Sequence, residues 1–302
     1  MLVAIVGATG TGKSQLSLDL AASLAQKGIP VEIVNADAMQ LYRGMDIGTN
    51  KLTVDERHEI PHHLLDVLDP SEEASVARYQ VEARQCIEEI EARGAWPVLV
   101  GGSGLYVSAV LYDFRFPGTD PVVRAALEER LDREGPGILF EELQRADPVA
   151  AESVGPANGR RIVRALEVIE LTGEPFGAGL GAEQRPWRVH RSLFVQEDRS
   201  VLVERLDRRV EKMWGAGIVA EVGGIGPSGF GSTASRAIGY AQALAQLAGT
   251  MSETEAIAQA QALTRRYARR QQSWFGRYRD AERLAAGESQ LVQRATAAVA
   301  AP

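Results

Sequence analysis

A glycine-rich loop directly after the first apolar segment constrains the fold of this chain more than any other feature of its sequence. Residues 2–6 are apolar, and residues 13–27 carry leucines at helical spacing. Between them the pattern G-x-x-x-x-G-K-[ST] is satisfied by Gly7, Ala8, Thr9, Gly10, Thr11, Gly12, Lys13 and Ser14. In a strand–loop–helix context, the backbone N–H groups of such a loop converge on an anion at the helix N-terminus. Lys13 adds a charge and the Ser14 hydroxyl can ligate Mg²⁺, so we predict a di- or triphosphate site.

The first 110 residues alternate between strand and helix patterns. Short apolar segments at residues 31–34 and 97–100 indicate two more buried strands, and residues 72–93 have the spacing of a long helix. Strands that are separated by helices form parallel sheets with helices on their faces. We therefore predict the α/β class, with a P-loop NTPase-like parallel sheet core.

The pattern becomes helical after a loop at residues 116–121 and stays so to about residue 173. Asp120 and Pro121 are the residue types of a helix N-cap and a first helical position. Glycines near residues 135 and 155 indicate turns within this segment. The segment predicts a group of short helices inserted into the α/β core.

The α/β pattern returns after a Gly-rich loop at residues 174–186, with a strand at 190–195 and a helix at 199–214. The predicted organisation is therefore a core domain of residues 1–114 plus 188–302, interrupted by a helical insertion domain of residues 115–187. For residues 288–302 we expect the end of a helix and a frayed tail.

Charge is distributed unevenly along the chain. Asp and Glu number 40 against 33 Lys and Arg, yet six arginines and no acidic residue lie between Thr264 and Arg279. A negative total with one basic segment favours a local site for a polyanion over general coating of nucleic acid. One cysteine, no apolar run of about 20 residues and no basic flank at the N-terminus predict a cytoplasmic protein with no membrane partner. We take a monomer as the expected state.

A carboxylate near the loop decides the kind of reaction. Enzymes that hydrolyse nucleoside triphosphates normally place an acidic residue at the end of a core strand. Here the strand at 97–100 ends in Gly101-Gly102-Ser103-Gly104, and the available acid is Asp37, after the strand at 31–34. Asp37 could hold magnesium, act as a base toward a second substrate, or cap a turn. Periodicity leaves these three alternatives open.

Several segments, taken together with the glycine loop, resemble one family, the tRNA dimethylallyltransferases (tRNA isopentenyltransferases). They occur in the same order as in the family and extend from residue 3 to about residue 279. The segments that carry the resemblance are Asp37–Thr49 (DAMQLYRGMDIGT), Pro61–Leu64 (PHHL), Val100–Tyr106 (VGGSGLY), Arg160–Val168 (RRIVRALEV), Ser235–Tyr240 (SRAIGY) and Thr264–Phe275 (TRRYARRQQSWF).

The resemblance implies that a dimethylallyl group passes from dimethylallyl diphosphate to the exocyclic amine of the adenosine 3′-adjacent to a tRNA anticodon. The products would be N6-isopentenyladenosine and diphosphate. Lys13, Ser14 with Mg²⁺ and Arg236 would neutralise charge on the leaving oxygen. Asp37 would accept the proton of the amine, and the Ser103 hydroxyl would hydrogen-bond to the reacting amine.

The resemblance also implies contacts with the tRNA anticodon stem-loop. At the mouth of the channel these contacts would come from Asp37, Ala38, Met39, Gln40 and Ser103. From the insertion they would come from Arg124, Arg160, Arg161, Ile162, Val163 and Arg164. The competing interpretation of the insertion arginines is a solvated helix face.

Other residues have a structural interpretation beside the functional one. The arginines of Tyr267–Tyr278 alternate with aromatic residues, which suits phosphate contacts and base stacking, but Trp274 and Phe275 more simply pack the helix on the core. For His62 and His63 we favour a hydrogen-bonded structural role, and the role of Gln242 stays open.

Three residues depart from the family pattern. Ala8 stands where Pro is common, Ala38 where Ser is common, and Ala241 where Arg is usual. Ala38 leaves only backbone for contact, and Ala241 removes one cation. Lys13, Ser14, Asp37 and Arg236 are all retained, so we expect activity.

Three other functions fit part of the sequence. A small-molecule P-loop kinase would use the loop and Asp37 but would not need the arginine-rich segment. A free-adenylate isopentenyltransferase would not need the insertion arginines at 160–164. A non-catalytic RNA-binding ATPase would normally have the strand-end acid. Tight binding of ATP would favour the kinase or the ATPase.

Overall fold

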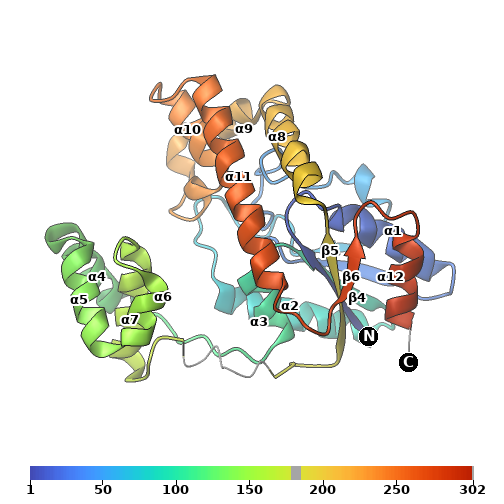
Figure 1. The fold of residues 1–302 in the computed structure, drawn as a ribbon, viewed down its shortest axis with the longest axis horizontal. Coiled ribbons are helices and arrows are strands. Elements are labelled where there is room, and N and C mark those ends of the chain that lie inside the picture. The colour runs from blue at the N-terminus through green and yellow to red at the C-terminus, as the bar shows by residue number, and fades with distance from the viewer. Residues whose placement is uncertain (178–184, 301–302) are drawn as a thin grey trace. The chain divides into compact units, whose positions relative to one another are not determined.

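The computed structural model describes residues 1–177 and 185–300. Its internal contacts divide the chain into two compact units, which are described separately: Met1–Leu111 with Arg188–Pro302, and Tyr112–Trp187 (Figure 1).

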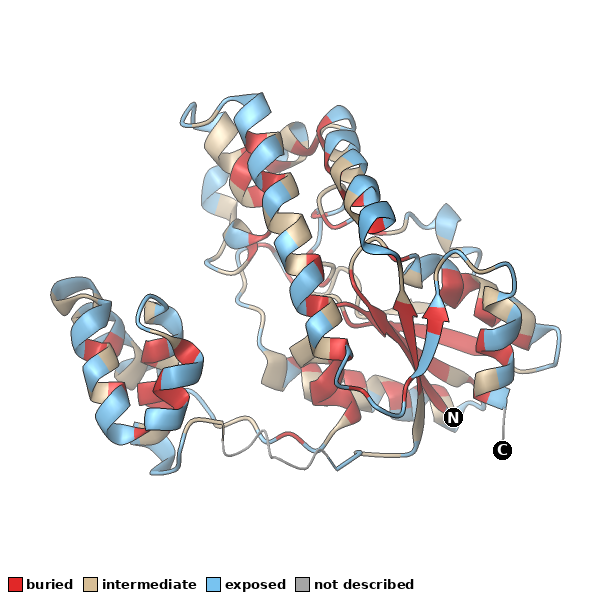
Figure 2. Ribbon diagram, in the orientation of Figure 1, coloured by how far each residue is buried: buried red, intermediate tan, exposed pale blue. Residues whose placement is uncertain are grey.

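The first unit is built on a six-stranded sheet in which every neighbouring pair of strands is parallel. The strand order is β3-β2-β4-β1-β5-β6. The strands are β1 Leu2–Gly7, β2 Val31–Asn35, β3 His62–His63, β4 Trp96–Gly101, β5 His190–Gln196 and β6 Glu282–Ala285. All residues of β1 and β2 are buried, as expected of apolar strands in the interior of a parallel sheet (Figure 2). The predicted α/β class with a parallel sheet is confirmed.

Helices cover both faces of this sheet. Apolar residues of α1 and α12 join those of β1, β2, β4 and β5 in one core. Helices α2 and α3 pack on each other, and both contact β4. These helices are α1 Lys13–Ala25, α2 Val76–Ala92, α3 Gly104–Leu111 and α12 Leu291–Ala300. The others of this unit are α8 Arg199–Gly215, α9 Ile218–Ile225, α10 Tyr240–Leu247 and α11 Glu253–Phe275. In the described part of this unit, 3₁₀ turns lie at Asp55–Arg57, Pro227–Gly229 and Ala234–Arg236.

The start of one helix, the C-terminal segment and one short strand of this unit differ from the sequence prediction. Helix α2 begins at Val76 rather than at residue 72, because the Ser75 side chain caps it by accepting the N–H of Arg78. The C-terminal segment is not a frayed tail over its described part: α12 packs on α1, and its Ala295 and Val299 are buried. The short, charged β6 that precedes it carries no apolar pattern and was not predicted.

The described residues of the second unit form four helices with a core of their own. The helices are α4 Pro121–Glu134, α5 Pro136–Ala146, α6 Pro148–Val154 and α7 Gly159–Thr172. Leu139, Leu143 and Ile162 are fully buried in this core. Asp120 caps α4 by accepting the N–H groups of Val122 and Val123, as predicted. The break at Asp147-Pro148, where Asp147 caps α6, was missed.

The two ends of the second unit pair with each other. Tyr112 forms an antiparallel bridge with Pro186, and the N–H of Asp113 donates to the carbonyl of Arg185 at 2.9 Å. The contact-based boundary therefore falls at residue 112, three residues before the start of the insertion domain expected from the sequence. Residues 178–184 of the Gly-rich loop expected at 174–186 lie outside the described residues.

Candidate active site

The glycine loop joins β1 to α1 in a conformation that requires glycine. Gly10 and Gly12 have φ values of +81° and +86°, and a Cβ on Gly7 would overlap with the carbonyl oxygen of Val195. The carbonyl of Ala8 accepts the Lys13 ammonium at 2.7 Å and the Thr11 hydroxyl at 2.9 Å. The side chain of Lys13, at the start of α1, is therefore hydrogen-bonded to the backbone of its own loop.

A cavity of about 360 Å³ lies beside this loop, which we call the phosphate cavity. Gly10, Gly12, Lys13 and Ser14 line it. Burial lowers the pKa of Lys13 to about 8; nearby Asp37 opposes this shift, and the charge of Arg209 adds to it. A cation whose charge is disfavoured by burial is well placed to gain from a bound anion.

A second cavity of about 310 Å³, which we call the acceptor cavity, adjoins the first. The residues that line both cavities are Thr9, Asp37, Thr49 and Arg209. Both cavities lie within the first unit. Among their described lining residues, Asp37 is the only carboxylate, and it stands at the junction.

Asp37 is held by the side chain of Asn35, at the end of β2. The Asn35 carboxamide accepts the Asp37 N–H at 2.9 Å and donates to the Asp37 carbonyl at 3.0 Å. Oδ1 of Asp37 also accepts the N–H of Met39 at 3.0 Å. The turn-capping role considered from the sequence is therefore real, and it occupies one carboxylate oxygen. No hydrogen bond to Oδ2 occurs within residues 1–177 and 185–300.

Ser103 connects the end of β4 to the turn after Asp37. Its hydroxyl oxygen accepts the N–H of Ala38 at 3.1 Å. Burial, followed by the charge of Asp37, raises the pKa of Tyr267 to about 12. Ser103 and Tyr267 both line the acceptor cavity with Asp37.

Arg209 of α8 is a site residue that the sequence analysis missed. Its Nη1 donates to the Thr9 hydroxyl at 2.8 Å, and burial lowers the pKa of the guanidinium. The Nε of Arg209 is buried without a hydrogen-bond partner in the described part of the chain. One turn earlier, Arg205 donates to the Gly10 carbonyl at 2.9 Å. The sequence held one signal for Arg209: it stands four residues after Arg205, on one face of a helix that follows a core strand.

Arg236 lines a different cavity from Lys13 and Ser14. It is exposed at the end of the 3₁₀ turn Ala234–Arg236 and lines the acceptor cavity, whereas Lys13 and Ser14 line the phosphate cavity. The segment before it is fixed by Glu73, which accepts the Ser232 N–H at 2.7 Å and the Thr233 hydroxyl at 2.5 Å.

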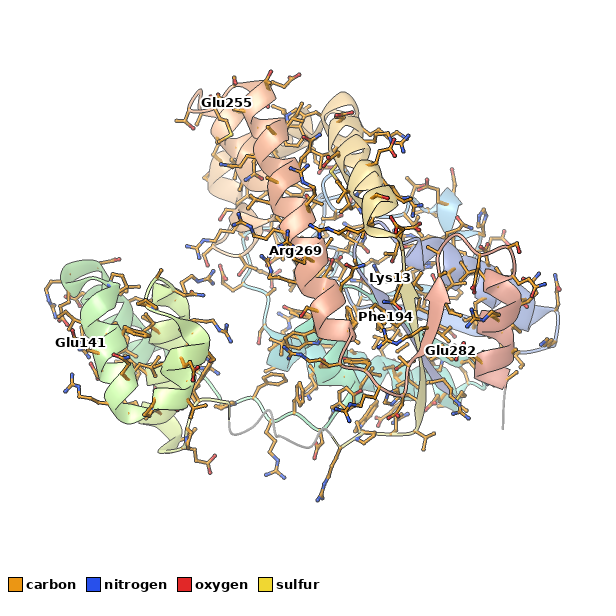
Figure 3. All side chains as sticks on the ribbon, viewed as in Figure 1. Lys13, Glu141, Phe194, Glu255, Arg269 and Glu282 are labelled. Carbon is orange, nitrogen blue, oxygen red and sulfur yellow. The ribbon has the colours of Figure 1, made fainter. Side chains whose placement is uncertain are left out.

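Helix α11 carries the predicted basic segment and lies against α8 (Figures 1 and 3). Trp274 packs on Gly104 and donates to the Ser108 hydroxyl, and Phe275 is fully buried, so these aromatic residues pack the helix on the core. The exposed arginines of this segment are Arg266, Arg269, Arg270, Arg277 and Arg279. Arg265 instead pairs with Asp207 of α8 at 2.5 Å.

The buried Gln271 of the same helix contacts two loops of the site. Its side-chain oxygen accepts the N–H of Thr9 at 2.8 Å, and its side-chain nitrogen donates to the carbonyl of Gly102 at 2.8 Å.

The remaining motif residues have structural contacts. Nε2 of His63 lies 2.6 Å from Glu32, and Nδ1 of His62 lies 2.7 Å from the carbonyl of Ile60. Gln242 accepts the N–H of Gly239 at 2.8 Å and so caps α10. Within the described ranges, no group of three His, Cys, Asp or Glu side chains could hold a metal ion.

The insertion arginines do not form one uniform surface. Arg124 and Arg164 both pair with Glu167, whose side chain is fully buried, and Arg164 also donates to the carbonyls of Pro117 and Gly118. Arg160 and Arg161 are exposed.

The side chains of Ile162 and Val163 are not exposed for the contact with tRNA that the resemblance implies, which leaves their backbone for it. Their exposed fractions are 0% and 2%, and both side chains belong to the apolar core of the second unit. Since they face inward from α7, they support the helix on which Arg160 and Arg161 stand. Ala38 is also restricted, because its N–H is already donated to Ser103.

No helix in the described part of the chain is both long and apolar enough to cross a membrane.

The sequence and the fold are similar to those of one group of known proteins. A family model described as IPP transferase matches residues 40–278. A tRNA dimethylallyltransferase of Clavibacter sepedonicus is 59% identical over 302 residues, covering 99% of this chain and 98% of that protein. One of Kineococcus radiotolerans is 55% identical over 279 residues, covering 91% of this chain and 88% of the relative.

Solved structures give the same result. A tRNA isopentenylpyrophosphate transferase from Bacillus halodurans superimposes with a TM-score of 0.70 at 37% identity, covering 98% of this chain and 94% of that chain. A eukaryotic dimethylallyltransferase, described as acting on tRNA, gives a TM-score of 0.79 at 29% identity, covering 98% of this chain and 77% of that one.

Proposed function

This chain belongs to the IPP transferase family, and we propose that it is a tRNA dimethylallyltransferase that acts on the exocyclic amine of the adenosine 3′-adjacent to the anticodon. In this reaction the bond between C1 of the dimethylallyl group and the diphosphate oxygen breaks, and a bond from C1 to N6 forms. Diphosphate leaves, and one proton leaves N6. The observation that carries this proposal is the position of Asp37, at the junction of a cationic cavity and a second cavity.

The phosphate cavity is the site for the diphosphate. Backbone N–H groups at the start of α1, the Lys13 ammonium and the Arg209 guanidinium all present positive charge to it. As the bond to C1 breaks, negative charge accumulates on the leaving oxygen, and these fixed groups stabilise that charge without reorganisation.

Ser14 fits a magnesium site. It is exposed and lines the phosphate cavity, and its hydroxyl is an oxygen ligand of the kind Mg²⁺ binds. Mg²⁺ is usually bound by few protein ligands together with phosphate oxygens, which agrees with the lack of a carboxylate cluster among the described residues. When bound, the ion would neutralise charge on the diphosphate.

Asp37 is the base. The lone pair of an adenine N6 is delocalised into the ring, so the nitrogen becomes nucleophilic as its proton departs. Asn35 fixes the backbone of Asp37, and the Met39 N–H fixes Oδ1, which leaves Oδ2 to take the proton. This arrangement favours the base over the magnesium ligand among the roles considered from the sequence.

Ser103 orients the adenine. Its oxygen accepts the N–H of Ala38, so its own proton can be donated to the incoming base. The Ser103 hydroxyl lines the acceptor cavity beside Asp37, where the amine has to arrive.

The acceptor cavity receives the adenosine after it leaves the anticodon stack, at a cost of a few kcal/mol. Arg236 and Arg270 line this cavity. The exposed arginines of α11 can contact the phosphates around the extruded nucleotide, and Arg160 and Arg161 can contact the anticodon stem-loop from the insertion. Arg236 reaches the leaving diphosphate from the acceptor cavity, which shares Asp37 and Arg209 with the phosphate cavity.

The test is transfer of label from labelled dimethylallyl diphosphate, with Mg²⁺, to unmodified tRNA and separately to AMP. Label on the adenosine beside the anticodon, and none on AMP, is the expected result. Label on AMP would instead indicate a free-adenylate enzyme. Turnover of ATP with no label on either acceptor would contradict the proposal and favour a kinase or an ATPase.

A further inference from the structure

We infer that Gln271 is a positioning residue: through it, the arginine-bearing helix α11 holds the phosphate loop in the conformation that binds diphosphate. The inference rests on the proposed function and extends it, because it assigns part of the affinity for the prenyl diphosphate to a residue of the helix with the RNA-facing arginines.

The contacts of Gln271 use both ends of its side-chain amide. The oxygen accepts the N–H of Thr9, and the nitrogen donates to the carbonyl of Gly102, each at 2.8 Å. The side chain is 4% exposed, so these bonds form away from water. An amide that is satisfied at both ends in a buried position has a single favourable orientation, which makes it a rigid link.

Thr9 is held from two sides. Gln271 of α11 accepts its N–H, and Arg209 of α8 donates to its hydroxyl. Thr9 also lines both cavities. If the bond from Gln271 is lost, a partly buried N–H in the loop loses its acceptor, and the loop can turn toward another one. The following residues of the loop, among them Gly10 and Gly12, which line the phosphate cavity, would then lose their alignment.

The lack of a side chain at Gly102 makes room for the side-chain amide of Gln271. A Cβ at this position would overlap with the Gln271 side-chain nitrogen and would lie 3.2 Å from the carbonyl oxygen of Gly7. The absence of a side chain therefore lets the amide reach the carbonyl of Gly102. The glutamine and the glycine are complementary in both hydrogen bonding and volume.

Neighbouring residues of α11 lie against the loop that follows β4 and contains Gly102. Tyr267, four residues earlier, lines the acceptor cavity together with Ser103, and Trp274, three residues later, packs on Gly104. Positions separated by three and four residues share one face of a helix. Arg266 and Arg269 are exposed on the same helix. Contact with RNA and the geometry of the phosphate loop thus depend on one rigid element.

The experiment compares Gln271→Met with Gln272→Met, which makes the same change one residue further along α11. Isothermal titration gives the affinity for inorganic pyrophosphate with Mg²⁺, and steady-state kinetics give KM and kcat. For Gln271→Met we expect about a tenfold rise both in the pyrophosphate Kd and in KM for dimethylallyl diphosphate. The kcat should fall as well, because the loop also stabilises the charge on the leaving oxygen, whereas the Kd for an anticodon stem-loop should change less than about threefold. Gln272→Met should resemble the wild type.

A purely structural role predicts a different result. If Gln271 only docks the helix, Gln271→Met should weaken pyrophosphate and stem-loop binding by the same factor, or leave the pyrophosphate Kd unchanged. Either result would overturn the inference. Because pyrophosphate binding needs no prenyl transfer, this readout stays valid even if the wild type proves to modify a different acceptor.

A second pair of variants tests the geometry of the link. Gly102→Ala alone should raise the pyrophosphate Kd, because the added methyl group pushes the Gln271 amide away. In a Gln271→Ala background the same change should have a smaller effect, since the space is then free. Equal effects in the two backgrounds would show that the loop is not held through this contact.

Discussion

A buried carboxylate of the insertion and two cations beside the phosphate cavity of the core have opposite surroundings. In the insertion, Glu167 is fully buried and is compensated by Arg124 and Arg164. In the core, burial lowers the pKa values of Lys13 and Arg209, which face a cavity. Paired charges of the first kind maintain a fold, whereas cations that are held without a matching carboxylate are typical of a binding site. The comparison separates structural arginines from functional ones, which residue type alone does not.

Asp37 is where we expect the largest effect, because it is the carboxylate placed between the cations and the acceptor. Asp37→Ala should reduce turnover by about two to four orders of magnitude, since the N6 proton then has no acceptor. The Kd for the anticodon stem-loop should stay nearly constant. Single-turnover kinetics with saturating RNA measure the step directly, and Asp19→Asn on α1 is a control. Lost RNA affinity with intact turnover of the bound complex would show that Asp37 binds RNA rather than acting as the base.

Arg209 should contribute to the binding of dimethylallyl diphosphate and not to the stability of the fold. Arg209→Met should raise KM for dimethylallyl diphosphate roughly 10- to 100-fold, because a charge-assisted contact with the diphosphate is lost. Its melting temperature should be unchanged or higher, since a desolvated guanidinium has been removed. The neighbouring Arg208, exposed and paired with Glu204, supplies the control Arg208→Met. A stable variant with an unchanged KM would remove Arg209 from the diphosphate site.

Arg164 should show the reverse behaviour. Arg164→Met leaves the buried Glu167 with Arg124 as its ion-pair partner, so unfolding should become easier by about 1–3 kcal/mol. Burial tends to raise the pKa of Glu167, but the hydrogen bonds from the two arginines outweigh it and lower the pKa below the ordinary 4.5. The pair therefore stabilises the fold fully above about pH 4.5 and progressively less as the pH falls further.

Denaturant titrations at pH 7 and below pH 4.5 measure this contribution. The destabilisation caused by Arg164→Met should shrink at the lower pH, where Glu167 gains a proton. An equal destabilisation at both values, or none at pH 7, would mean that the ion pair does not support the insertion.

Lys13 should make diphosphate binding depend on pH in the alkaline range. With a pKa of about 8 in the free protein, its ammonium is present below pH 8 and is progressively lost above it. Binding an anion favours the charged form, so the pyrophosphate Kd should rise by up to about tenfold per pH unit above 8. Titrations of wild type and Lys13→Arg at pH 7, 8 and 9 separate this effect from ionisation of the ligand. Parallel profiles for the two proteins would assign the pH dependence elsewhere.

The phosphate loop and most of the elements around it could be predicted from the sequence because each depends on local patterns. The glycines of the loop, the apolar strands and the cap at Asp120 are all visible within a few residues. Arg209 and Gln271 could not be found in this way. Their partner Thr9 lies 200 and 262 residues away in the chain, so their contacts exist only after the sheet has formed. Arg164 is a different case: its partner Glu167 is only three residues away on the same helix, but the sequence does not show that this glutamate is fully buried.

Arg160 and Arg161 should show the smallest effect, and they test whether the insertion contributes any functional arginines at all. Both are exposed on α7, beside Arg164, which is tied to Glu167. Replacing both with Ala should weaken anticodon stem-loop binding several-fold and reduce the slope of log K against log salt by about one to two, because two phosphate contacts are lost. Stability should be unchanged, in contrast to Arg164→Met. If neither the affinity nor the slope changes, these two residues form a solvated helix face, and the arginines of the insertion are either structural or merely solvent-exposed.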